Sequence, residues 1–502
     1  MDKLVVILTF FLTHFFIFSL RNFVNGATIT SCTQTPYPDV CNFYMGNSLN
    51  VAANLDQTQF SFRDVAIQLT LSQAVQAHQL VSSMDSSSFD QRAKLAWNDC
   101  VELYEDTIHH LNLSKTTNNP IDSQTWLSAA IANQQTCQNG FIDFNLASHL
   151  QTLPSMLGNI TKLISNSLAI NKATTVTSST SHSNFAKVAN RRLLSDGFPA
   201  WLSVADRKLL QTTGAPPKAD IVVAQDGSGN FKTITEAVAA AGGGKRTVIY
   251  VKAGVYKENV DIKRSAKNIM LIGDGIDATI VTGSKNAQTT TTFRSATAVA
   301  LRSGSDFSVF YRCSFKGYQD TLYVYSQRQF YRDCDIYGTV DFIFGDAVAV
   351  FQSCNIYIRR PMSGQKNTVT AQGRTDQNEN TGIVIHNSRV TASSDMKAVQ
   401  SSFKSYLGRP WQKYSRTVFM KSTLDGLIDR EGWLPWSGNF ALSTLYYAEY
   451  MNTGAGADTS GRVKWGGYHV IGATEAAKFT VGNFLAGNSW IPGTGVPFEV
   501  GL

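Results

Sequence analysis

Helical spacing of apolar residues characterises the first part of the chain. Between about residues 30 and 170, apolar positions recur every three or four residues, and polar turns separate the segments. Residues 62–84 show this spacing at Val65, Leu69, Val75, Leu80 and Met84. Several such segments joined by polar turns predict an all-α antiparallel four-helix bundle.

Apolar runs of strand length replace this pattern from residue 217 onward. The runs 247–251, 269–272 and 280–282 contain mainly Val, Ile, Leu and Thr, and glycines and polar residues separate them. None of these runs reaches the length of a helix. We therefore expect the C-terminal part to consist of short β-strands.

An internal repeat indicates how these strands are arranged. Residues 310–322 (FYRCSFKGYQDTL) align with residues 331–343 (YRDCDIYGTVDFI) at an offset of 21 positions, and a third copy follows in VFQSCNIYI. The alignment superimposes Cys313 on Cys334, and Cys354 lies 20 positions beyond Cys334. Short strands that repeat at about this interval predict an all-β right-handed parallel β-helix.

The repeat brings two acidic residues together. Asp320 and Asp341 occupy the same position in consecutive copies, each three residues after a glycine. One coil apart, their backbones would lie about 4.8 Å from each other. Two carboxylates at that distance do not both ionise easily, which leaves one proton donor and one anion. Such a pair suits nucleophilic attack combined with protonation of a leaving group.

The alternative is that Asp320 and Asp341 only cap their own turns. Stacked like charges without compensating groups would then cost stability, and the aromatic residues beside them indicate a cleft, so the catalytic interpretation is favoured. These aromatic residues are Tyr318, Tyr323, Phe342 and Phe344. The repeat by itself does not tell which aspartate is the acid.

A second candidate feature is the turn 407–411 (LGRPW), which places Arg409 two residues from Trp411. A guanidinium can hold a carboxylate and an indole can stack on a sugar face, although an arginine packed on a loop tryptophan is the plainer alternative. The motifs Gly-x-Ser-x-Gly, His-Glu-x-x-His and Cys-x-x-Cys are absent from the sequence. We therefore expect neither a serine triad nor a metal site, and no cofactor.

Residues 1–26 are typical of a secretory signal peptide. A lysine precedes an apolar run from residue 4 to 20, and small residues follow it. A retained membrane anchor is the alternative, but polar residues interrupt a run that is already short for a bilayer span. We expect cleavage near Gly26 and a secreted, extracellular protein without stable membrane insertion.

Secretion changes the interpretation of other residues. Seven cysteines in a secreted chain predict disulfides, and the odd number leaves at least one thiol over. The sequons that begin at Asn112 and Asn159 predict glycosylation of the helical part.

Residues 171–216 have the composition of a linker, rich in Ser, Thr, Lys and Arg. Two dibasic sites, Arg191-Arg192 and Arg207-Lys208, each precede a pair of leucines. Exposed basic sites in a secreted linker invite cleavage by a processing protease, and the alternative is a linker that is merely basic. We predict that the two parts of the chain are separated during maturation.

Charge is concentrated in the C-terminal part. The net charge is +7, and residues 212–502 carry 31 Lys and Arg against 23 Asp and Glu. A secreted basic domain attracts polyanions, which outside the cell are more often acidic polysaccharides than nucleic acid.

Four motifs resemble those of plant pectin methylesterases, and the resemblance covers residues 217–502. The motifs are GYQDTL, YGTVDFIFG, NTVTAQGRTD and YLGRPW. The preceding part, with TQTPYPDVC and four cysteines, resembles the pectin methylesterase inhibitor domain that many family members carry as a pro-region. The resemblance implies hydrolysis of the methyl esters of polygalacturonate in the cell wall. It implies four segments: signal peptide 1–26, inhibitor-like bundle 27–170, processed linker 171–216 and catalytic β-helix 217–502.

Roles for single residues follow from the same resemblance. Asp341 resembles the nucleophile, and Asp320 resembles the general acid that protonates methanol and then activates water. Gln319 is similar to an oxyanion stabiliser, Arg409 to the residue that orients Asp341, and Trp411 and Thr292 to substrate contacts. The resemblance also implies the disulfides Cys334–Cys354, Cys32–Cys41 and Cys100–Cys137. Methyl-esterified homogalacturonan is the implied substrate, and the chain's own inhibitor-like domain or a separate inhibitor protein is an implied partner.

One segment departs from the family pattern. Thr297 runs directly into Ala298, where the family has about one more coil ending in a second oxyanion glutamine. A β-helix can lose a whole coil and stay stacked, but losing one oxyanion donor typically lowers the rate about 100- to 1000-fold. Two alternatives therefore stand beside the esterase. One is a catalytically impaired wall protein that binds pectin or an esterase, and the other is a retaining glycoside hydrolase, which also uses paired carboxylates.

Overall fold

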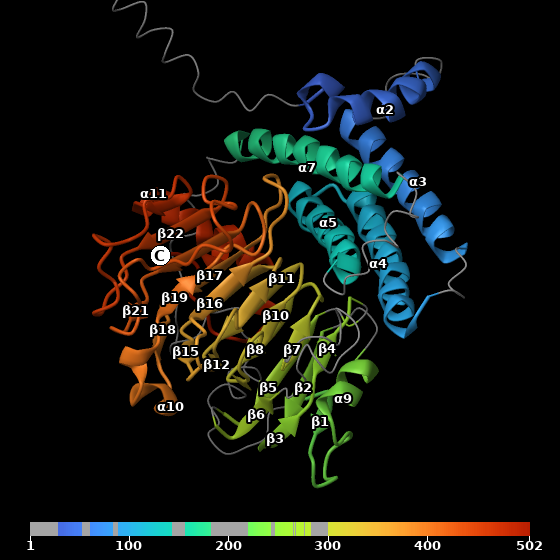
Figure 1. The fold of residues 1–502 in the computed structure, drawn as a ribbon. Helices are drawn as coiled ribbons and strands as arrows, with labels where there is room; N and C mark the ends of the chain where they lie inside the picture. The colour runs from blue at the N-terminus through green and yellow to red at the C-terminus, as the bar shows by residue number, and fades with distance from the viewer. Residues whose placement is uncertain are drawn as a thin grey trace, which may run out of the picture.

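The computed structural model divides into a helical domain and a β-helix (Figure 1). It describes residues 29–52, 61–83, 89–142, 156–181, 219–241, 246–264, 266, 268–275, 277–282 and 300–502. The predicted signal peptide, Thr292 and the dibasic sites at Arg191-Arg192 and Arg207-Lys208 lie outside these residues.

Four long helices form the predicted bundle. They are α3 (Phe62–Ser83), α4 (Gln91–Thr116), α5 (Pro120–Ile142) and α7 (Met156–Ser181), accompanied by α2 (Pro38–Ala52) and the short η2 (Cys32–Gln34). Contacts run from α3 to α4, α4 to α5, α5 to α7 and α7 back to α3, which closes the four-helix arrangement. Asp90 begins α4 as its N-cap, because its carboxylate accepts a hydrogen bond from the Ala93 backbone N–H at 2.8 Å.

The face that α3 turns to the core differs from the predicted one. Val75 and Leu80 are 36% and 37% exposed, although their spacing suggested burial. Other residues take their place, and the buried positions on α3 are Ala66, Ile67, Thr70, Leu71, Ala74, Ala77 and Val81. The core-facing stripe therefore mixes alanine and threonine, which let neighbouring helices approach closely, with three larger apolar residues.

Three parallel sheets form the β-helix, and the middle coils contribute one strand to each sheet. Sheet 1 contains β1 (Ile221–Val223), β2 (Thr247–Val251), β5 (Ile269–Gly273), β8 (Ser308–Tyr311), β11 (Arg328–Arg332), β14 (Val348–Gln352), β17 (Gly382–His386), β20 (Arg416–Met420), β22 (Tyr446–Tyr450) and β23 (Tyr468–Val470). Sheet 2 contains β3 (Gly254–Lys257), β6 (Thr279–Thr282), β9 (Ser314–Lys316), β12 (Asp335–Gly338), β15 (Asn355–Ile358), β18 (Arg389–Ala392) and β21 (Thr423–Leu424). Sheet 3 contains β4 (Val260–Ile262), β7 (Leu301–Ser303), β10 (Leu322–Val324), β13 (Ile343–Gly345), β16 (Asn367–Gln372) and β19 (Ser405–Gly408).

Short helices complete the β-helix at its ends and turns. They are α9 (Ile234–Ala240), α10 (Ser394–Lys397), α11 (Ala473–Ala476), α12 (Val481–Phe484), η3 (Gln400–Ser402), η4 (Ala477–Phe479), η5 (Gly487–Ser489) and η6 (Ile491–Thr494). The first of these, α9, packs its buried Ile234 and Val238 into the core of the opening coil.

The register of the strands confirms the predicted repeat. Phe315 pairs with Ile336 between β9 and β12, and Leu322 pairs with Ile343 between β10 and β13. Each pair is separated by the 21 residues of the sequence repeat. Inside the coils, like residues therefore stack on like residues, and Phe310, Tyr331 and Phe351 form a column of parallel rings.

All three sheets are continuous across the position of the missing coil. Strand β5 pairs with β8, β6 with β9 and β4 with β7. The buried Arg302 on β7 forms an ion pair with Asp261 on β4 at 2.7 Å, in strand register. The coils on either side of the shortened segment therefore stack directly on each other.

A column of free thiols marks one corner of the coils. Cys313, Cys334 and Cys354 stand immediately before β9, β12 and β15, and all three are buried and free. The implied disulfide between Cys334 and Cys354 is not formed, and both thiols contact backbone carbonyls. Cys334 Sγ, for example, donates to the carbonyls of Phe310 and Arg332 at 3.4 Å. In the helical domain, by contrast, Cys32–Cys41 and Cys100–Cys137 are bonded as the resemblance implied.

Candidate active site

The two aspartates of the repeat lie on consecutive coils. Each stands two residues before a paired position, Leu322 or Ile343, so Asp341 stacks on Asp320. Both have a left-handed backbone, with φ of 55° at Asp320 and 52° at Asp341. Aspartate tolerates this conformation better than most residues, and its occurrence at both positions gives the two side chains a common direction.

The repeated glycines make these turns possible. A Cβ atom on Gly317 would lie 2.5 Å from the Thr321 hydroxyl oxygen, and one on Gly338 would lie 2.1 Å from the Cβ atom of Phe342. In each turn, the residue directly after the aspartate therefore packs against the glycine. This explains why a glycine recurs three residues ahead of each aspartate.

Asp341 is buried and surrounded by donors. The Arg409 Nε donates to its Oδ1 at 2.8 Å, and an Arg409 terminal nitrogen donates to its Oδ2 at 2.6 Å. Thr368, on the next coil, donates its hydroxyl to Oδ1 at 2.6 Å. Charge-assisted hydrogen bonds of this kind favour a carboxylate anion in a fixed orientation.

Asp320 has the opposite electrostatic setting. Burial raises its pKa well above the usual range, and the neighbouring charge of Asp341 raises it further. Arg409 and the Gln319 side chain oppose these effects without reversing them. Burial and the neighbouring charge therefore favour the neutral form of Asp320, whereas hydrogen-bond donors converge on the Asp341 carboxylate.

Aromatic side chains form a surface beside the pair. Tyr323 and Phe344 stack at 4.3 Å between ring centroids, and Trp411 meets both rings edge-on. Of the other two aromatic residues expected there, Phe342 is fully buried in the β-helix core. Tyr318 instead stacks against the Arg359 guanidinium at 3.9 Å, on the exposed side of the turn.

Arg409 packs on a different tryptophan from the one that the sequence suggested. Its guanidinium carbon lies 4.3 Å from the centre of the Trp436 ring, whereas Trp411 packs against Tyr323 and Phe344. Trp436 and Thr368 were both missed by sequence reasoning. Thr368 lies within the NTVTAQGRTD motif, but only the strand register shows that it stacks on Asp341.

Comparisons with known proteins match both parts of the chain to protein families. The family model described as Pectinesterase matches residues 220–298 and 296–488. The model described as Plant invertase/pectin methylesterase inhibitor matches residues 27–170.

The chain belongs to the pectinesterase family. Pectinesterase 2 of Citrus sinensis is 52% identical over 94% of both chains. Probable pectinesterase/pectinesterase inhibitor 6 of Arabidopsis thaliana is 54% identical over 95% of both. Among solved structures, pectin methylesterase from carrot is 55% identical and superimposes with a TM-score of 0.53, over 58% of this chain and 99% of the carrot chain.

The pectinesterase match is interrupted once along the chain. Its two segments meet at residues 296–298, and the departure from the family motifs falls between Thr297 and Ala298. The break lies before β7 in the sequence, and the turn that carries Asp320 leads into β10, the strand paired with β7. In this pectinesterase, the turns that carry Asp320 and Asp341 are therefore intact, and the altered segment precedes them in the sequence.

The inhibitor-like domain covers the aromatic surface of the pectinesterase domain. Buried residues of the helical core form one cluster with Tyr323, Tyr325 and Phe344. The Tyr325 hydroxyl donates to the Asn133 side chain of α5 at 2.7 Å. Figure 1 shows α5 lying against the β-helix near β10 and β11. The surface beside the aspartates is thus occupied by protein in the full chain.

Charge complementarity holds the two domains together. Arg328 is 3% exposed and pairs with Asp306 of its own domain at 2.6 Å and with Asp122 at the start of α5. The Trp126 indole N–H, one turn further along α5, donates to Asp306 at 3.3 Å. On α4, acidic residues meet basic residues of the β-helix through the ion pairs Glu102–Lys263 and Asp106–Arg264.

The loop 373–381 makes the second set of contacts between domains. The Gln124 amide of α5 donates to the Asn378 carbonyl at 2.7 Å, and the Asn380 amide donates to the Thr125 hydroxyl at 2.9 Å. On α7, the Ser165 hydroxyl donates to Asp376. One loop therefore touches two helices of the bundle.

Two buried carboxyl groups lie under this loop. Asp346 and Glu379 interact side chain to side chain, and burial raises the pKa of both. Asp346 Oδ2 and Glu379 Oε2 have no other hydrogen-bond partner among the described residues. A proton on one of the two carboxyl groups would give these oxygens a donor, and the guanidiniums of Arg374 and Arg416 lie nearby.

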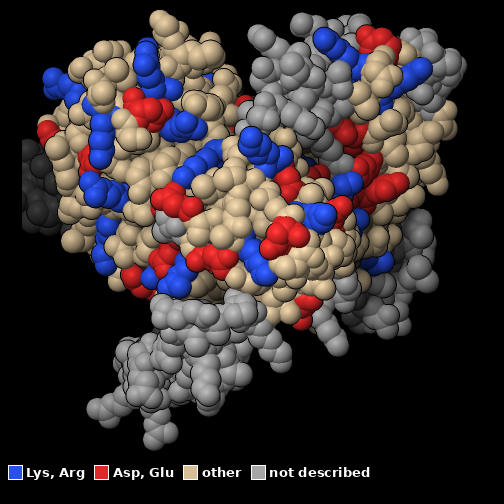
Figure 2. Space-filling model, turned by 90° about the horizontal axis from the view of Figure 1, so that it is seen from below, with Lys and Arg blue, Asp and Glu red and all other residues tan. Residues whose placement is uncertain are grey.

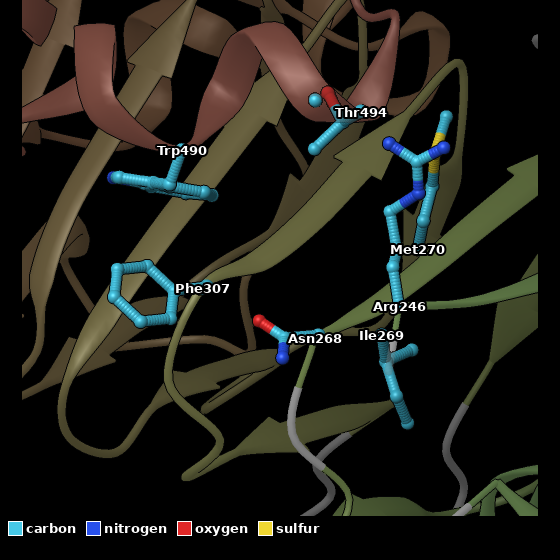
Figure 3. Close-up of a pocket in the computed structure, with 8 residues that line it drawn as sticks. Arg246, Asn268, Ile269, Met270, Phe307, Trp490 and Thr494 are labelled. Atoms are coloured by element: carbon cyan, nitrogen blue, oxygen red, sulfur yellow. The ribbon is translucent and has the colours of Figure 1, made fainter. Parts of the chain in front are cut away.

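A separate hollow of about 380 Å³ lies between sheet 1 and the C-terminal helical turns. Figure 3 shows Trp490 and Phe307 on one side of it and Arg246 on the other. The Trp490 indole N–H donates to the Leu485 carbonyl at 3.0 Å, and the Thr494 hydroxyl donates to the Ile491 carbonyl at 2.7 Å. Because these polar groups serve the chain's own backbone, we interpret the hollow as a packing seam.

Charge on the surface is mixed where it can be seen. On the face drawn in Figure 2, basic and acidic side chains are interspersed. The excess of basic over acidic residues in the C-terminal part therefore does not form a single patch on that face. Within the described residues, no group of three His, Cys, Asp or Glu side chains is placed to hold a metal ion.

Proposed function

We propose that this pectinesterase hydrolyses the methyl esters of polygalacturonate in the cell wall, releasing methanol and leaving carboxylates. The observation that carries the proposal is the asymmetry of the aspartate pair. Donors converge on Asp341, and the pKa of Asp320 is raised by burial and by its neighbour. One member is thus prepared as a nucleophile and the other as an acid.

The reaction proceeds in two steps. A carboxylate oxygen of Asp341 attacks the ester carbonyl carbon, and the C–O bond to methanol breaks as Asp320 gives the leaving oxygen its proton. The product is an acyl anhydride on Asp341. Asp320, now a carboxylate, takes a proton from water, whose oxygen attacks the anhydride and regenerates Asp341. Each proton that leaves Asp320 in the first step returns in the second.

Other residues serve the same two steps. Gln319 lies on the exposed side of the turn, adjacent to Asp320, and we assign its amide to the oxyanion of the tetrahedral intermediate. Arg409 orients Asp341 through the contacts described above. Trp411 offers an edge of the aromatic surface to a sugar ring, and Thr292, outside the described residues, keeps its predicted substrate role.

The shortened segment lowers the expected rate. The family's second oxyanion glutamine lies on the coil that this chain lacks, and one missing donor typically costs about 100- to 1000-fold in rate. We therefore expect a slow esterase. This same feature favours the second candidate function, a wall protein that binds pectin or an esterase without efficient turnover.

The helical domain acts as an autoinhibitory pro-region in this proposal. It covers Tyr323 and Phe344 beside the aspartates, and a polysaccharide could not lie there while α5 is in place. Secretion through the signal peptide, glycosylation at Asn112 and Asn159, and cleavage at the dibasic sites by a protease complete the proposal. Asn112 is exposed on α4, as a glycosylated residue must be. No helix among the described residues is long and apolar enough to cross a membrane.

Methanol release from methylated pectin tests the function. The secreted chain would be cleaved at its linker and compared with an Asp341→Asn variant prepared in the same way. We expect methanol from the first, at least 1000-fold less from the variant, and no new reducing ends from either. Equal rates would remove the esterase assignment, and reducing ends would indicate a glycoside hydrolase.

A further inference from the structure

The stacking that aligns the two aspartates continues for one more coil. Strand β13 pairs with β16 so that Ile343 faces Thr370, and the residue two positions before Thr370 is Thr368. Asp341 stands two positions before Ile343. The column therefore runs from Asp320 through Asp341 to Thr368, with a hydroxyl where the preceding coils have carboxylates.

Thr368 contacts Asp341 twice. Its hydroxyl donates to Asp341 Oδ1 at 2.6 Å and accepts a hydrogen bond from the Asp341 backbone N–H at 2.9 Å. Thr368 is fully buried, and its own backbone N–H donates to the Thr339 carbonyl at 3.1 Å. The hydroxyl is thus held in place by the β-helix and serves one carboxylate only.

We propose that Thr368 is a positioning residue that places the negative charge of the pair on Asp341. This inference rests on the proposed esterase function. The two aspartates share their backbone conformation, their turn and their position in the coil. Their neighbours distinguish them: Arg409 donates hydrogen bonds to Asp341, and the column adds the Thr368 hydroxyl on the side of Asp341 alone.

Arg409 does not make this distinction by charge alone. The guanidinium contacts Asp341, but its positive charge also favours the ionised form of Asp320. A hydroxyl acts through a short directional hydrogen bond, so Thr368 favours the anion only on the carboxylate that it touches. It also fixes the backbone of Asp341 in its left-handed conformation, so charge and direction are set by the same side chain.

The test replaces the hydroxyl while keeping the shape. Thr368→Val removes the donor, and Thr368→Ser retains it. A matched control is Thr417→Val, because Thr417 is fully buried on a neighbouring strand and its hydroxyl has no partner among the described residues. All three would be cleaved at the linker, and methanol release would be measured as a function of pH.

We expect Thr368→Val to move the acid limb of the pH–rate profile up by about one pH unit, because the anion loses a charge-assisted donor. The plateau kcat should fall about 10-fold with KM unchanged. Thr368→Ser and Thr417→Val should keep the parent's acid limb. A merely structural role for Thr368 would lower stability or activity without moving that limb.

A titration that needs no turnover separates this inference from the proposed function. In ¹³C NMR of the aspartate carboxyl carbons, the first carboxyl of the pair to ionise should do so at higher pH in Thr368→Val. If the parent releases no methanol but this shift is seen, the function fails and the inference stands. If both readouts match those of Thr417→Val, the inference is overturned. Should Thr368→Val not fold, Thr368→Cys must show an intermediate shift, and an unchanged titration there would overturn it equally.

Discussion

Asp320 and Asp341 are held in the same strained backbone conformation by different partners. The Asp320 N–H donates to the Val340 carbonyl at 3.0 Å, an ordinary contact between coils. The Asp341 N–H donates instead to the Thr368 hydroxyl. A left-handed backbone costs a non-glycine residue about 1 kcal/mol or more, so each turn persists only because the next coil holds it. The backbone conformation of each aspartate therefore depends on the stacking of whole coils.

Gly338→Ala tests this dependence at one residue. The new methyl group would lie 2.1 Å from the Cβ atom of Phe342, which is fully buried and unable to move aside. We expect a loss of about 3 kcal/mol in the free energy of unfolding, measured by denaturant titration. Gly472→Ala is the control, because no atom lies within 4 Å of the corresponding position. A loss of similar size in both variants would contradict the packing argument.

At the scale of elements, the sequence predicts those features that repeat at a fixed interval. The strands, their register and the aspartate pair follow from the offset of 21 residues, because coils of equal length bring equal positions together. The next coil is longer, and 27 residues separate Asp341 from Thr368, so the offset no longer identifies the third member of the column. Trp436 lies in an irregular loop beyond Arg409, where no periodicity can place it.

Two further features, the buried face of α3 and the state of the stacked cysteines, are not determined by residue type alone. The helix α3 was predicted correctly, but its core-facing stripe was not, because that stripe includes alanine and threonine positions, which hydrophobic spacing does not identify, and leaves Val75 and Leu80 partly exposed. Cys334 and Cys354 were correctly placed on adjacent coils, yet stacking in register directs both thiols towards carbonyls. Whether stacked cysteines bond depends on side-chain direction, which the repeat does not specify.

The loop 373–381 should respond to pH through its buried carboxyl groups. Burial raises the pKa of Glu379 well above its usual value, so the unfolded chain loses this proton at lower pH than the folded protein does. Stability from the protonated form of Glu379 is complete below about pH 4.3 and falls as pH rises towards the folded-state pKa. Glu379→Gln imitates the protonated acid and should remove this loss.

Thermal unfolding at pH 5 and pH 8 measures the difference. We expect the parent protein to lose more stability than Glu379→Gln over this interval, and the two to be similar at pH 5. Glu475→Gln is the control, since Glu475 is half exposed and pairs with Lys478 at the surface. An identical pH dependence in parent and Glu379→Gln would show that the pair is not protonated in the folded state.

At the scale of the whole molecule, the two domains are docked through a limited set of polar contacts around an aromatic centre. Arg328 forms ion pairs with both domains, one with Asp122 of α5 and one with Asp306. Asp306 belongs to the same domain as Arg328, so this second pair does not need α5. Separation of the domains therefore does not leave a buried arginine without its carboxylate. Such an interface can be opened without damage to the β-helix, as a removable pro-region requires.

Weakening this interface should activate the full chain. The double variant Asp122→Ala/Trp126→Ala removes two contacts of α5 and leaves the Arg328–Asp306 pair intact. If docking blocks the substrate, each 1.4 kcal/mol lost from docking raises the open fraction about 10-fold, and methanol release by the uncleaved protein should rise accordingly. Glu105→Ala is the control, because Glu105 contacts His78 within the helical domain. An uncleaved double variant no more active than this control would exclude inhibition by docking.

The column of three free thiols gives the middle coils a built-in chemical reporter. Burial and contact between thiols raise the pKa of Cys313 and Cys334, and neither side chain is accessible in the closed coil. A thiol reagent can therefore react with them only when the coil opens, so the labelling rate measures the free energy of that opening. Since the helical domain's four cysteines are bonded, the label would record events in the β-helix alone.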